Sequence, residues 1–322
     1  MIIFIMDETT ILKKESPDLH DKNRFWKVTG KILLSLAIAL VGTSVVQLIA
    51  ILLLVVSKAV PSEDIAYLMT MNIPWVTFIL VTLQGICFIG AAAMMYAWFE
   101  RKRGWPTGLK QPRITMDTLV GLGWGAALIS AAFLIMWIAG GIEIRAVVWN
   151  DPKVWSAIGW SLAMFTAVAV SEEIFSRGYI QGLISYHYGS IAAVIVSSVV
   201  FALLHSFNPA VWSSGLPILN LILAGVLLGV CRLASGGLWL PIGVHLTWNF
   251  FQGNVFGFKV SGTEVESVIS ITPSPSSILS GGDFGAEGSV VVSILLIIAT
   301  YLTYWWFNLK RPPAANVIGN RS

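Results

Sequence analysis

Charged residues are scarce in this sequence: Asp, Glu, Lys and Arg together make up 11% of its 322 residues. A water-soluble domain carries roughly a quarter. Because hydrophobic residues reach 56% and the mean hydropathy is +0.78, the composition excludes a soluble globule and predicts a polytopic membrane protein. The net charge is only +3, from 20 basic and 17 acidic residues spread along the chain, which excludes a nucleic-acid-binding surface.

Cysteine is almost absent, and two common hydrolase signatures are missing. Cys87 and Cys231 lie 144 positions apart in apolar runs, without the CxxC or zinc-finger spacing of a metal site, so we expect small buried hydrophobic residues. Neither HExxH, the paired histidines of many zinc proteases, nor GxSxG, the turn that carries a nucleophilic serine, occurs. The N-terminus lacks the basic region and cleavage site of a signal peptide, so a removable leader is not expected.

Apolar segments long enough to cross a bilayer recur along the chain. A hydrocarbon core about 30 Å thick takes about 20 helical residues, and eight segments reach or approach that length. We therefore predict an all-α, polytopic membrane helix bundle with about eight transmembrane helices, the fifth of them short. The segments are residues 32–56, 73–99, 119–142, 154–180, 191–205, 216–233, 238–256 and 290–307.

The basic residues predict the orientation of these spans. Lys and Arg accumulate in cytoplasmic loops, and eight spans put both termini on the same side. Placing both termini in the cytoplasm leaves only Lys58, Arg145, Lys153 and Lys259 facing outward. The cytoplasmic set is then Lys13, Lys14, Lys22, Arg24, Lys27, Lys31, Arg101, Lys102, Arg103, Lys110, Arg113, Arg232, Lys310, Arg311 and Arg321.

The chain divides into five parts by composition. Residues 1–31, rich in charges of both signs, are predicted to form a cytoplasmic tail, and residues 32–153 the first three spans. Residues 154–256 hold four spans. Residues 257–289, rich in Ser, Gly and Pro, are interpreted as an outer loop or a re-entrant lid. Residues 290–322 hold the last span and a cytoplasmic tail.

Two carboxylates lie inside the fourth span. A charge there costs at least ~2.5–3.5 kcal/mol, so such a residue faces the bundle interior or a water-filled cavity and usually marks a functional site. Arg177 follows Glu173 by four residues, in the order that favours a helical ion pair, so Glu173 is interpreted first as a structural partner. Glu172 points about 100° away around the helix and needs another explanation.

Two histidines on other spans supply that explanation. His205 closes the string FALLH, and His245 opens HLTWN, which places Asn249 one helical turn further along the same face. A single buried histidine is usually a hydrogen-bonded core residue. Two of them on separate helices, sharing a membrane interior with an unpaired carboxylate, instead favour a catalytic site.

Helix geometry allows these groups to meet. Glu172 lies 17 residues before Gly189 and His205 lies 16 after it, so each stands about 25 Å from that turn along antiparallel helices. His245 is only about 12 Å beyond the cytoplasmic turn at Gly237, and this difference disappears if residues 172–188 and their partner helix project about 10–15 Å beyond the membrane core, which the polar string SYHYGS permits. The three side chains are therefore predicted to lie at one level, in the cytoplasmic half of the bundle.

Three strings together resemble the CPBP family of intramembrane proteases: EExxxR at residues 172–177, FxxxH at 201–205 and HxxxN at 245–249. That family contains the Rce1-like CAAX prenyl endopeptidases and the bacterial Abi proteins associated with bacteriocin processing and self-immunity. The resemblance covers residues 154–256, which makes that part the expected catalytic core. It implies that Glu172 activates the attacking water with help from His205, and that His245 and Asn249 stabilise the oxyanion.

For the two remaining motif residues, Glu173 and Arg177, the resemblance implies a supporting role, with Arg177 at the cavity and in reach of substrate. Peptide hydrolysis needs a base for water and donors aimed at the carbonyl oxygen, and these side chains supply both. The predicted reaction is hydrolysis of membrane-associated or lipidated peptides and proteins by glutamate-activated water, without a cofactor.

Several alternatives stay open. Glu172, His205 and His245 have the residue types of a zinc site, so a zinc-dependent protease is the first alternative. A transporter with a proton relay, or a non-catalytic membrane scaffold, are the others. Besides its substrate, the only expected partner is the lipid bilayer; a bacterial plasma membrane is the expected location. The substrate and the oligomeric state are not predicted, because small residues such as Gly121, Gly123 and Gly125 can pack helices within or between chains.

Overall fold

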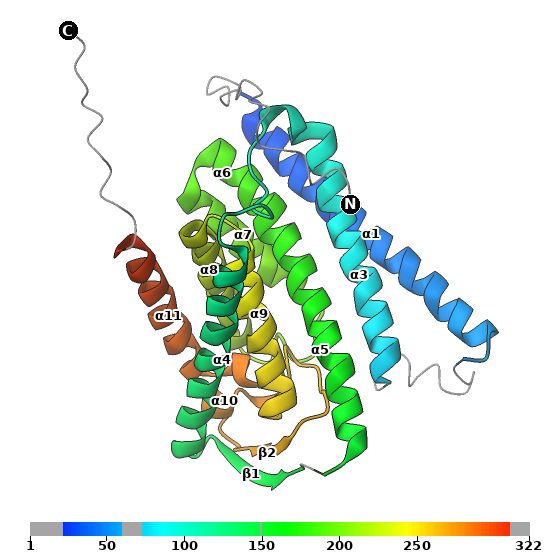
Figure 1. Ribbon diagram of the computed structural model, residues 1–322, viewed down its shortest axis with the longest axis vertical. Helices are drawn as coiled ribbons and strands as arrows, with labels where there is room; N and C mark the ends of the chain where they lie inside the picture. The colour runs from blue at the N-terminus through cyan, green and yellow to red at the C-terminus, as the bar shows by residue number, and fades with distance from the viewer. Residues whose placement is uncertain (1–21, 60–72, 149, 310–322) are drawn as a thin grey trace.

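The computed structural model describes residues 22–59, 73–148 and 150–309, and its helices form a bundle (Figure 1). The predicted tails fall largely outside these residues, as do Lys13, Lys14, Lys310, Arg311 and Arg321. In chain order the α-helices are α1 (Arg24–Val56), α3 (Pro74–Met95), α4 (Ile114–Ile138), α5 (Pro152–Glu173), α6 (Gly182–Tyr188), α7 (Ser190–Leu204), α8 (Gly215–Ser235), α9 (Trp239–Phe250), α10 (Ser277–Ser280) and α11 (Val290–Leu309).

Shorter helical turns extend three of these helices. The π-helical segments η3 (Tyr96–Glu100), η5 (Ile174–Gln181) and η6 (Phe251–Val255) continue α3, α5 and α9, and the 3₁₀ turn η4 (Arg101–Arg103) follows η3. Because η5 joins α5 to α6, helical structure runs without a break from Pro152 to Tyr188. The 3₁₀ turns η7 (Gly282–Phe284) and η8 (Ala286–Gly288) precede α11.

The prediction of an all-α membrane bundle is confirmed. In the described part of the chain, five helical stretches are long and apolar enough to cross a bilayer, and α7 and α11 are shorter apolar helices. Every predicted span corresponds to a helix, with ends that differ by up to eight residues. The number of crossings and the orientation stay predictions, because helix length and composition alone do not fix them.

The predicted third span, residues 119–142, is wrong at its C-terminal end. Helix α4 ends at Ile138, and Gly140 then adopts φ +72°, a left-handed conformation that stops the helix. The chain continues into β1 (Ile142–Val147), which pairs antiparallel with β2 (Ile269–Pro273), Ile142 opposite Pro273. This two-stranded sheet, which was not predicted, closes one end of the bundle (Figure 1).

Residues 257–289 form a packed segment across the same end. Phe258, Phe284 and Ala286 are buried within it. Asn220 of α8 donates from Nδ2 to the carbonyl oxygens of Glu287 and Ser289, at 2.7 and 2.8 Å. These contacts tie the segment to the bundle, so it is an ordered cap and not an unstructured loop.

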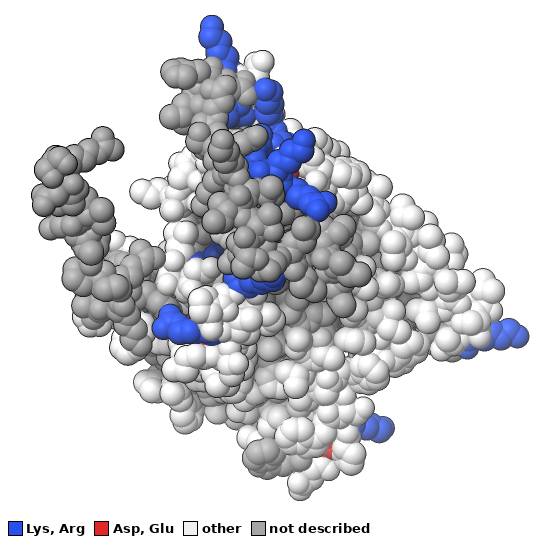
Figure 2. Space-filling model, turned by 45° about the horizontal axis from the view of Figure 1, so that its top comes forward, with Lys and Arg blue, Asp and Glu red and all other residues white. Residues whose placement is uncertain are grey.

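Basic side chains gather at the opposite end. Lys31 Nζ and Arg103 Nη1 lie 2.5 and 2.8 Å from carboxylate oxygens of Glu100, which joins the start of α1 to the η3–η4 turn. The guanidinium of Arg24 lies over the ring of Tyr188, at the end of α6. Figure 2 shows Lys and Arg concentrated over this part of the surface. We call it the basic end, and the end that carries β1 and β2 the far end.

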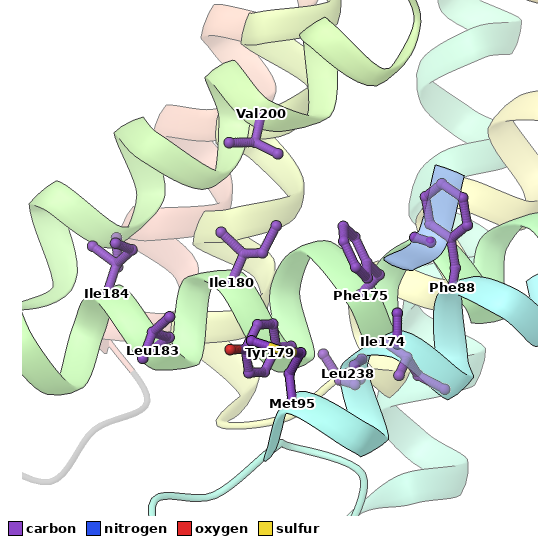
Figure 3. Close-up of a cluster of buried hydrophobic side chains, with 14 of the residues drawn as sticks. Phe88, Met95, Ile174, Phe175, Tyr179, Ile180, Leu183, Ile184, Val200 and Leu238 are labelled. Carbon is purple, nitrogen blue, oxygen red and sulfur yellow. The ribbon is translucent and has the colours of Figure 1, made fainter. Parts of the chain in front are cut away.

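Outer helices and core differ in what their apolar residues contact. Helix α1 exposes large side chains such as Leu48 and Leu52 along much of its length, which suits a helix that faces lipid. The core nearest the basic end packs Phe88, Phe175 and Leu183 with their neighbours (Figure 3). This core fixes the helices on which the motif residues lie.

Candidate active site

The three motifs meet inside the bundle. Glu172 lies one residue before the end of α5, His205 directly follows α7, and His245 lies within α9. The Nε2 atoms of His205 and His245 are 3.9 and 4.0 Å from the same carboxylate oxygen, Oε2 of Glu172. The structure thus brings together the acid and the two imidazoles that the sequence predicts to meet.

The Glu172 carboxylate lacks a direct hydrogen bond where the imidazoles face it. Its side chain is 17% exposed, and Oε2 is buried without a hydrogen-bond partner among the described residues. Distances of 3.9 and 4.0 Å are too long for hydrogen bonds to His205 and His245, but they leave a separation that one water molecule can bridge. The geometry suits an acid that acts on a water molecule.

Glu173 differs in one of its two oxygens: Oε2 is also buried without a partner among the described residues, but Oε1 is bonded. It is fully buried, and its Oε1 accepts hydrogen bonds from Arg177 Nη1 and His245 Nδ1, each at 3.0 Å. The predicted ion pair with Arg177 is therefore present. The bond to His245 was not predicted: it links the ion pair to the imidazole that faces Glu172.

The partners of the two imidazoles determine which ring nitrogen carries hydrogen. His205 Nδ1 lies 2.8 Å from the carbonyl oxygen of Phe201, which only accepts, so Nδ1 carries the proton. In the neutral ring, Nε2 then presents its lone pair toward Glu172. His245 Nδ1 donates to Glu173 in the same way, and a charged His245 also has a proton on Nε2. The two rings are thus held in defined orientations.

Arg177 lies behind the site and not on its wall. It belongs to η5, a wide helical turn of the kind often found at functional sites. Its side chain is fully buried, Nη2 donates to the Gly225 carbonyl of α8 at 3.2 Å, and the guanidinium lies 4.3 Å from the centroid of the Phe201 ring. Arg177 is not among the residues that line the cavity, so the part of the expectation that placed it there is not met; contact with substrate stays a prediction.

Helix α9 is positioned by a close crossing with α4. A Cβ atom added to Gly121 would collide with the Leu240 carbonyl oxygen, and one added to Gly125 with that of Val244. Only glycine lets the two backbones approach this closely. Of the alternatives left open, Gly121 and Gly125 therefore pack helices within the chain, whereas Gly123 has nothing within 4 Å. This crossing fixes the backbone of Val244 and therefore also the position of the next residue, His245.

A cavity of about 870 Å³ reaches the site. Glu172, His205, His245 and Asn249 all line it. Its other walls come from α1, α3, α5, α8 and the cap, and they include polar side chains of the first two helices, such as Thr43, Ser44 and Gln84. The space is large enough for an extended peptide.

Comparison with known families agrees with this arrangement. Residues 153–251 match the family model described as type II CAAX prenyl endopeptidase, Rce1-like. The resemblance is confirmed for this segment. No curated protein matches the chain. The Rce1-like segment starts in the first turn of α5 and ends just after α9, so it contains every motif residue. At the family level, the match supports a CAAX-type intramembrane protease.

The side chains of the Rce1-like segment suit zinc in type but not in spacing. Bonds of about 2.0–2.2 Å in a tetrahedral site put ligand atoms roughly 3.3–3.5 Å apart. The oxygen–nitrogen separations at Glu172 are 3.9 and 4.0 Å. Across the residues that the structure describes, no group of three or more His, Cys, Asp or Glu is arranged to hold a metal ion. A zinc form of the enzyme would need the three side chains to approach one another by roughly half an ångström.

Sequence reasoning missed the contributions from outside the Rce1-like segment. Thr43, Ser44 and Gln84 lie in the first two spans, and Glu264 and Glu287 in the cap, yet all five line the cavity. The only available signal was their polarity inside or beside apolar runs. They come from separate parts of the chain, so their convergence depends on tertiary packing.

Proposed function

We propose that this protein is an intramembrane endopeptidase in which Glu172 activates water for direct attack on a peptide bond. The observation that carries the proposal is the buried, unpartnered Oε2 of Glu172, about equally distant from the Nε2 atoms of His205 and His245. The family match supports the same class of reaction. The proposed substrates are membrane-associated or lipidated peptides and proteins, and bacteriocin-like peptides are one such class.

In the first step, water held between Glu172 and His205 attacks the scissile carbonyl carbon. Glu172 takes the proton, and the Nε2 lone pair of His205 accepts the second hydrogen of the same water in a hydrogen bond that orients it. The tetrahedral intermediate then collapses, the proton passes from Glu172 to the leaving nitrogen, and the products are a carboxylic acid and an amine, which exchange a proton to become a carboxylate and an ammonium ion. General-base catalysis of this kind contributes about 10²–10⁴-fold in rate.

His245 and Asn249 are proposed to stabilise the carbonyl oxygen as it becomes negative. Both line the cavity from one face of α9, one helical turn apart. Glu173 accepts from His245 Nδ1 and so turns Nε2 toward the cavity; when the ring is protonated, its Nε2–H can donate to the oxyanion. A donor of this kind is worth about 2.7–4 kcal/mol in the transition state.

Glu173 and Arg177 are proposed as positioning residues. Arg177 neutralises Glu173, and Glu173 orients His245. A buried pair that keeps a reacting imidazole in one tautomer parallels the carboxylate that orients the histidine of other hydrolases. Neither side chain lines the cavity, which agrees with a role that does not involve substrate contact.

Proteomics of membrane peptides in cells tests this proposal. Cells that express Glu172→Ala or His245→Ala should accumulate uncleaved peptides that wild-type cells process, with the variant protein present in normal amounts. Glu143→Gln, an exposed acid of β1 that does not line the cavity, is the matched control and should process normally. Unchanged processing in the Glu172 variant would favour the transporter or scaffold.

Chelation distinguishes the two versions of the protease. The glutamate mechanism predicts that purified protein keeps its cleavage rate after treatment with a strong zinc chelator. Stoichiometric zinc whose removal abolishes cleavage, and whose return restores it, would instead establish the zinc alternative with Glu172, His205 and His245 as ligands.

A further inference from the structure

The cavity extends from the site toward the far end of the molecule, and along its side it reaches the exposed Leu40 and Ser44 of α1. Along α5 it is lined by Lys153, Ala157, Ser161, Met164, Val168 and Glu172, a stripe with helical spacing that runs from the first turn of the helix to the site. The mouth also includes Asp151, Glu264 and Glu266, which are exposed. The cavity therefore opens at the far end, beside the sheet and the cap.

Buried side chains occupy the region between the site and the basic end. Glu173, Arg177 and Gln181 are fully buried there, and the amide of Gln181 donates to the Gly229 carbonyl at 3.1 Å. Arg232 donates to the carbonyl oxygens of Arg177 and Pro106, across the end of the bundle. The apolar core of Figure 3 fills the space around these groups.

The lining of the cavity confirms this asymmetry. No cavity-lining residue within the described ranges comes from the start of α1, the η3–η4 turn, α6 or the turn between α8 and α9, which together make up the basic end. A path straight from the basic end to Glu172 along η5 is filled by the buried Glu173–Arg177 pair. Breaking a buried pair by removing one partner costs about 3–5 kcal/mol.

The basic residues predict which side of the membrane each end faces. Lys and Arg within about 15–20 residues of a span favour the cytoplasm. Lys31, Arg101, Lys102 and Arg103 all lie at the basic end, whereas Lys153 is at the mouth of the cavity. By this rule the basic end is cytoplasmic and the far end faces outward.

From these observations we infer that the substrate enters from the extracytoplasmic side, as an extended chain threaded along α5. The inference rests on the proposed protease function and narrows its substrate class. It assigns the site to exported peptides, or to outward-facing segments of membrane proteins, and not to lipidated C-termini that stay in the cytoplasm. The site is closer to the cytoplasmic end, yet its entrance lies on the other side.

The length of the path sets a requirement on the substrate. From Lys153 to Glu172 the helix rises about 28 Å, which an extended chain spans with about nine residues. A cleavable bond should therefore lie at least that far along an unfolded segment. A folded domain joined closer to the bond would stop at the mouth.

Proteoliposomes with an impermeant, quenched fluorescent peptide test the side of entry. The peptide is first selected as one that detergent-solubilised wild type cleaves and Glu172→Gln does not. Vesicle orientation is assigned by labelling Lys102→Cys, at the basic end, or Glu143→Cys, at the far end, with an impermeant maleimide. Labelling of the wild-type protein measures the background signal from its own cysteines, Cys87 and Cys231.

Three outcomes separate the possibilities. Cleavage of external peptide only in vesicles whose far end faces outward is expected. Cleavage only when the basic end faces outward would overturn the inference and leave the protease proposal standing. If no peptide is cleaved in detergent, the proposed function itself fails and the inference with it.

A matched pair of variants on α5 tests the path independently. Ala157 lines the cavity near its mouth, and two residues on, a side chain at Gly159 would meet nothing within 4 Å. Ala157→Phe should lower the cleavage rate about tenfold or more, whereas Gly159→Phe should leave it unchanged. Thermal unfolding of both variants controls for misfolding. Wild-type cleavage by a well-folded Ala157→Phe protein would contradict entry along α5.

Discussion

Glu172 and Glu173 are adjacent in the sequence but face opposite halves of the bundle. Glu173 points into the packed half toward the basic end, where it is fully buried and bonded to Arg177 and His245. Glu172 points into the cavity, where its Oε2 has no partner among the described residues. The comparison shows how one helix supplies both a fixed charge pair and a reactive acid: the 100° step between neighbours puts them on different surfaces.

The largest expected contrast is in stability. Glu173→Gln leaves the Arg177 guanidinium buried without a compensating charge, so the free energy of unfolding should fall by about 3–5 kcal/mol. Glu172→Gln removes a charge that makes no direct bond on its reactive side, and should change that free energy by less than about 0.5–1 kcal/mol. Denaturation of purified protein in mild detergent measures both. Equal destabilisation by the two variants would erase the distinction between the carboxylates.

The second contrast compares two asparagines that line the cavity, Asn249 and Asn208. Asn249→Ala removes a proposed oxyanion donor and should lower kcat by about 10²–10³-fold with little change in KM. Asn208→Ala is the control: Asn208 also lines the cavity, but its amide donates to the Ser261 carbonyl in the cap at 3.2 Å. Steady-state cleavage of one peptide by both variants checks this. A comparable fall in kcat for Asn208→Ala would argue against a specific role for Asn249.

The third contrast concerns the packing of α4 against α9. Gly125→Val places a side chain against the Val244 backbone and should cost about 1–3 kcal/mol while displacing His245. At Gly123, two residues away, an added Cβ atom meets nothing within 4 Å, so Gly123→Val should leave the free energy of unfolding nearly unchanged. Thermal unfolding and cleavage rate should fall together for the first variant only. If both variants behave alike, α4 does not position α9.

The smallest expected effect comes from replacing Phe201, whose ring lies between Arg177 and His245. Phe201 lies 4.3 Å from the Arg177 guanidinium and 5.9 Å from the His245 ring, measured to its centroid. Phe201→Leu keeps an apolar side chain but removes the cation–π contact, worth about 0.5–2 kcal/mol. Unfolding free energy should drop by that amount, and cleavage should slow only a few-fold. A loss as large as that of Asn249→Ala would give Phe201 a part in the chemistry.

Much of the fold was predictable because its signals are local. Long apolar runs predict helices whatever they pack against, and every predicted span has its helix. The meeting of Glu172 and His205 was predictable for the same reason: both lie a similar number of residues from the turn at Gly189, and helical rise converts that count into depth.

Contacts between residues that are distant in the chain could not be predicted from the sequence. The strands β1 and β2 pair although they lie more than a hundred residues apart in the chain. Moreover, β2 belongs to residues 257–289, whose Ser, Gly and Pro content indicates a loop. The hydrogen bond from His245 to Glu173 depends on the crossing of α5 and α9. Gly121 and Gly123 are equivalent by composition, and only the position of α9 shows which one packs.

Single-turnover cleavage by purified Glu172→Gln, beside wild type and Glu143→Gln in the same liposomes, tests the central claim most directly. If Glu172 is the base, wild type and Glu143→Gln cut the peptide at the same rate, while Glu172→Gln binds it but cuts it about 10²–10⁴-fold more slowly. Cleavage by a folded Glu172→Gln protein at the wild-type rate would contradict the account.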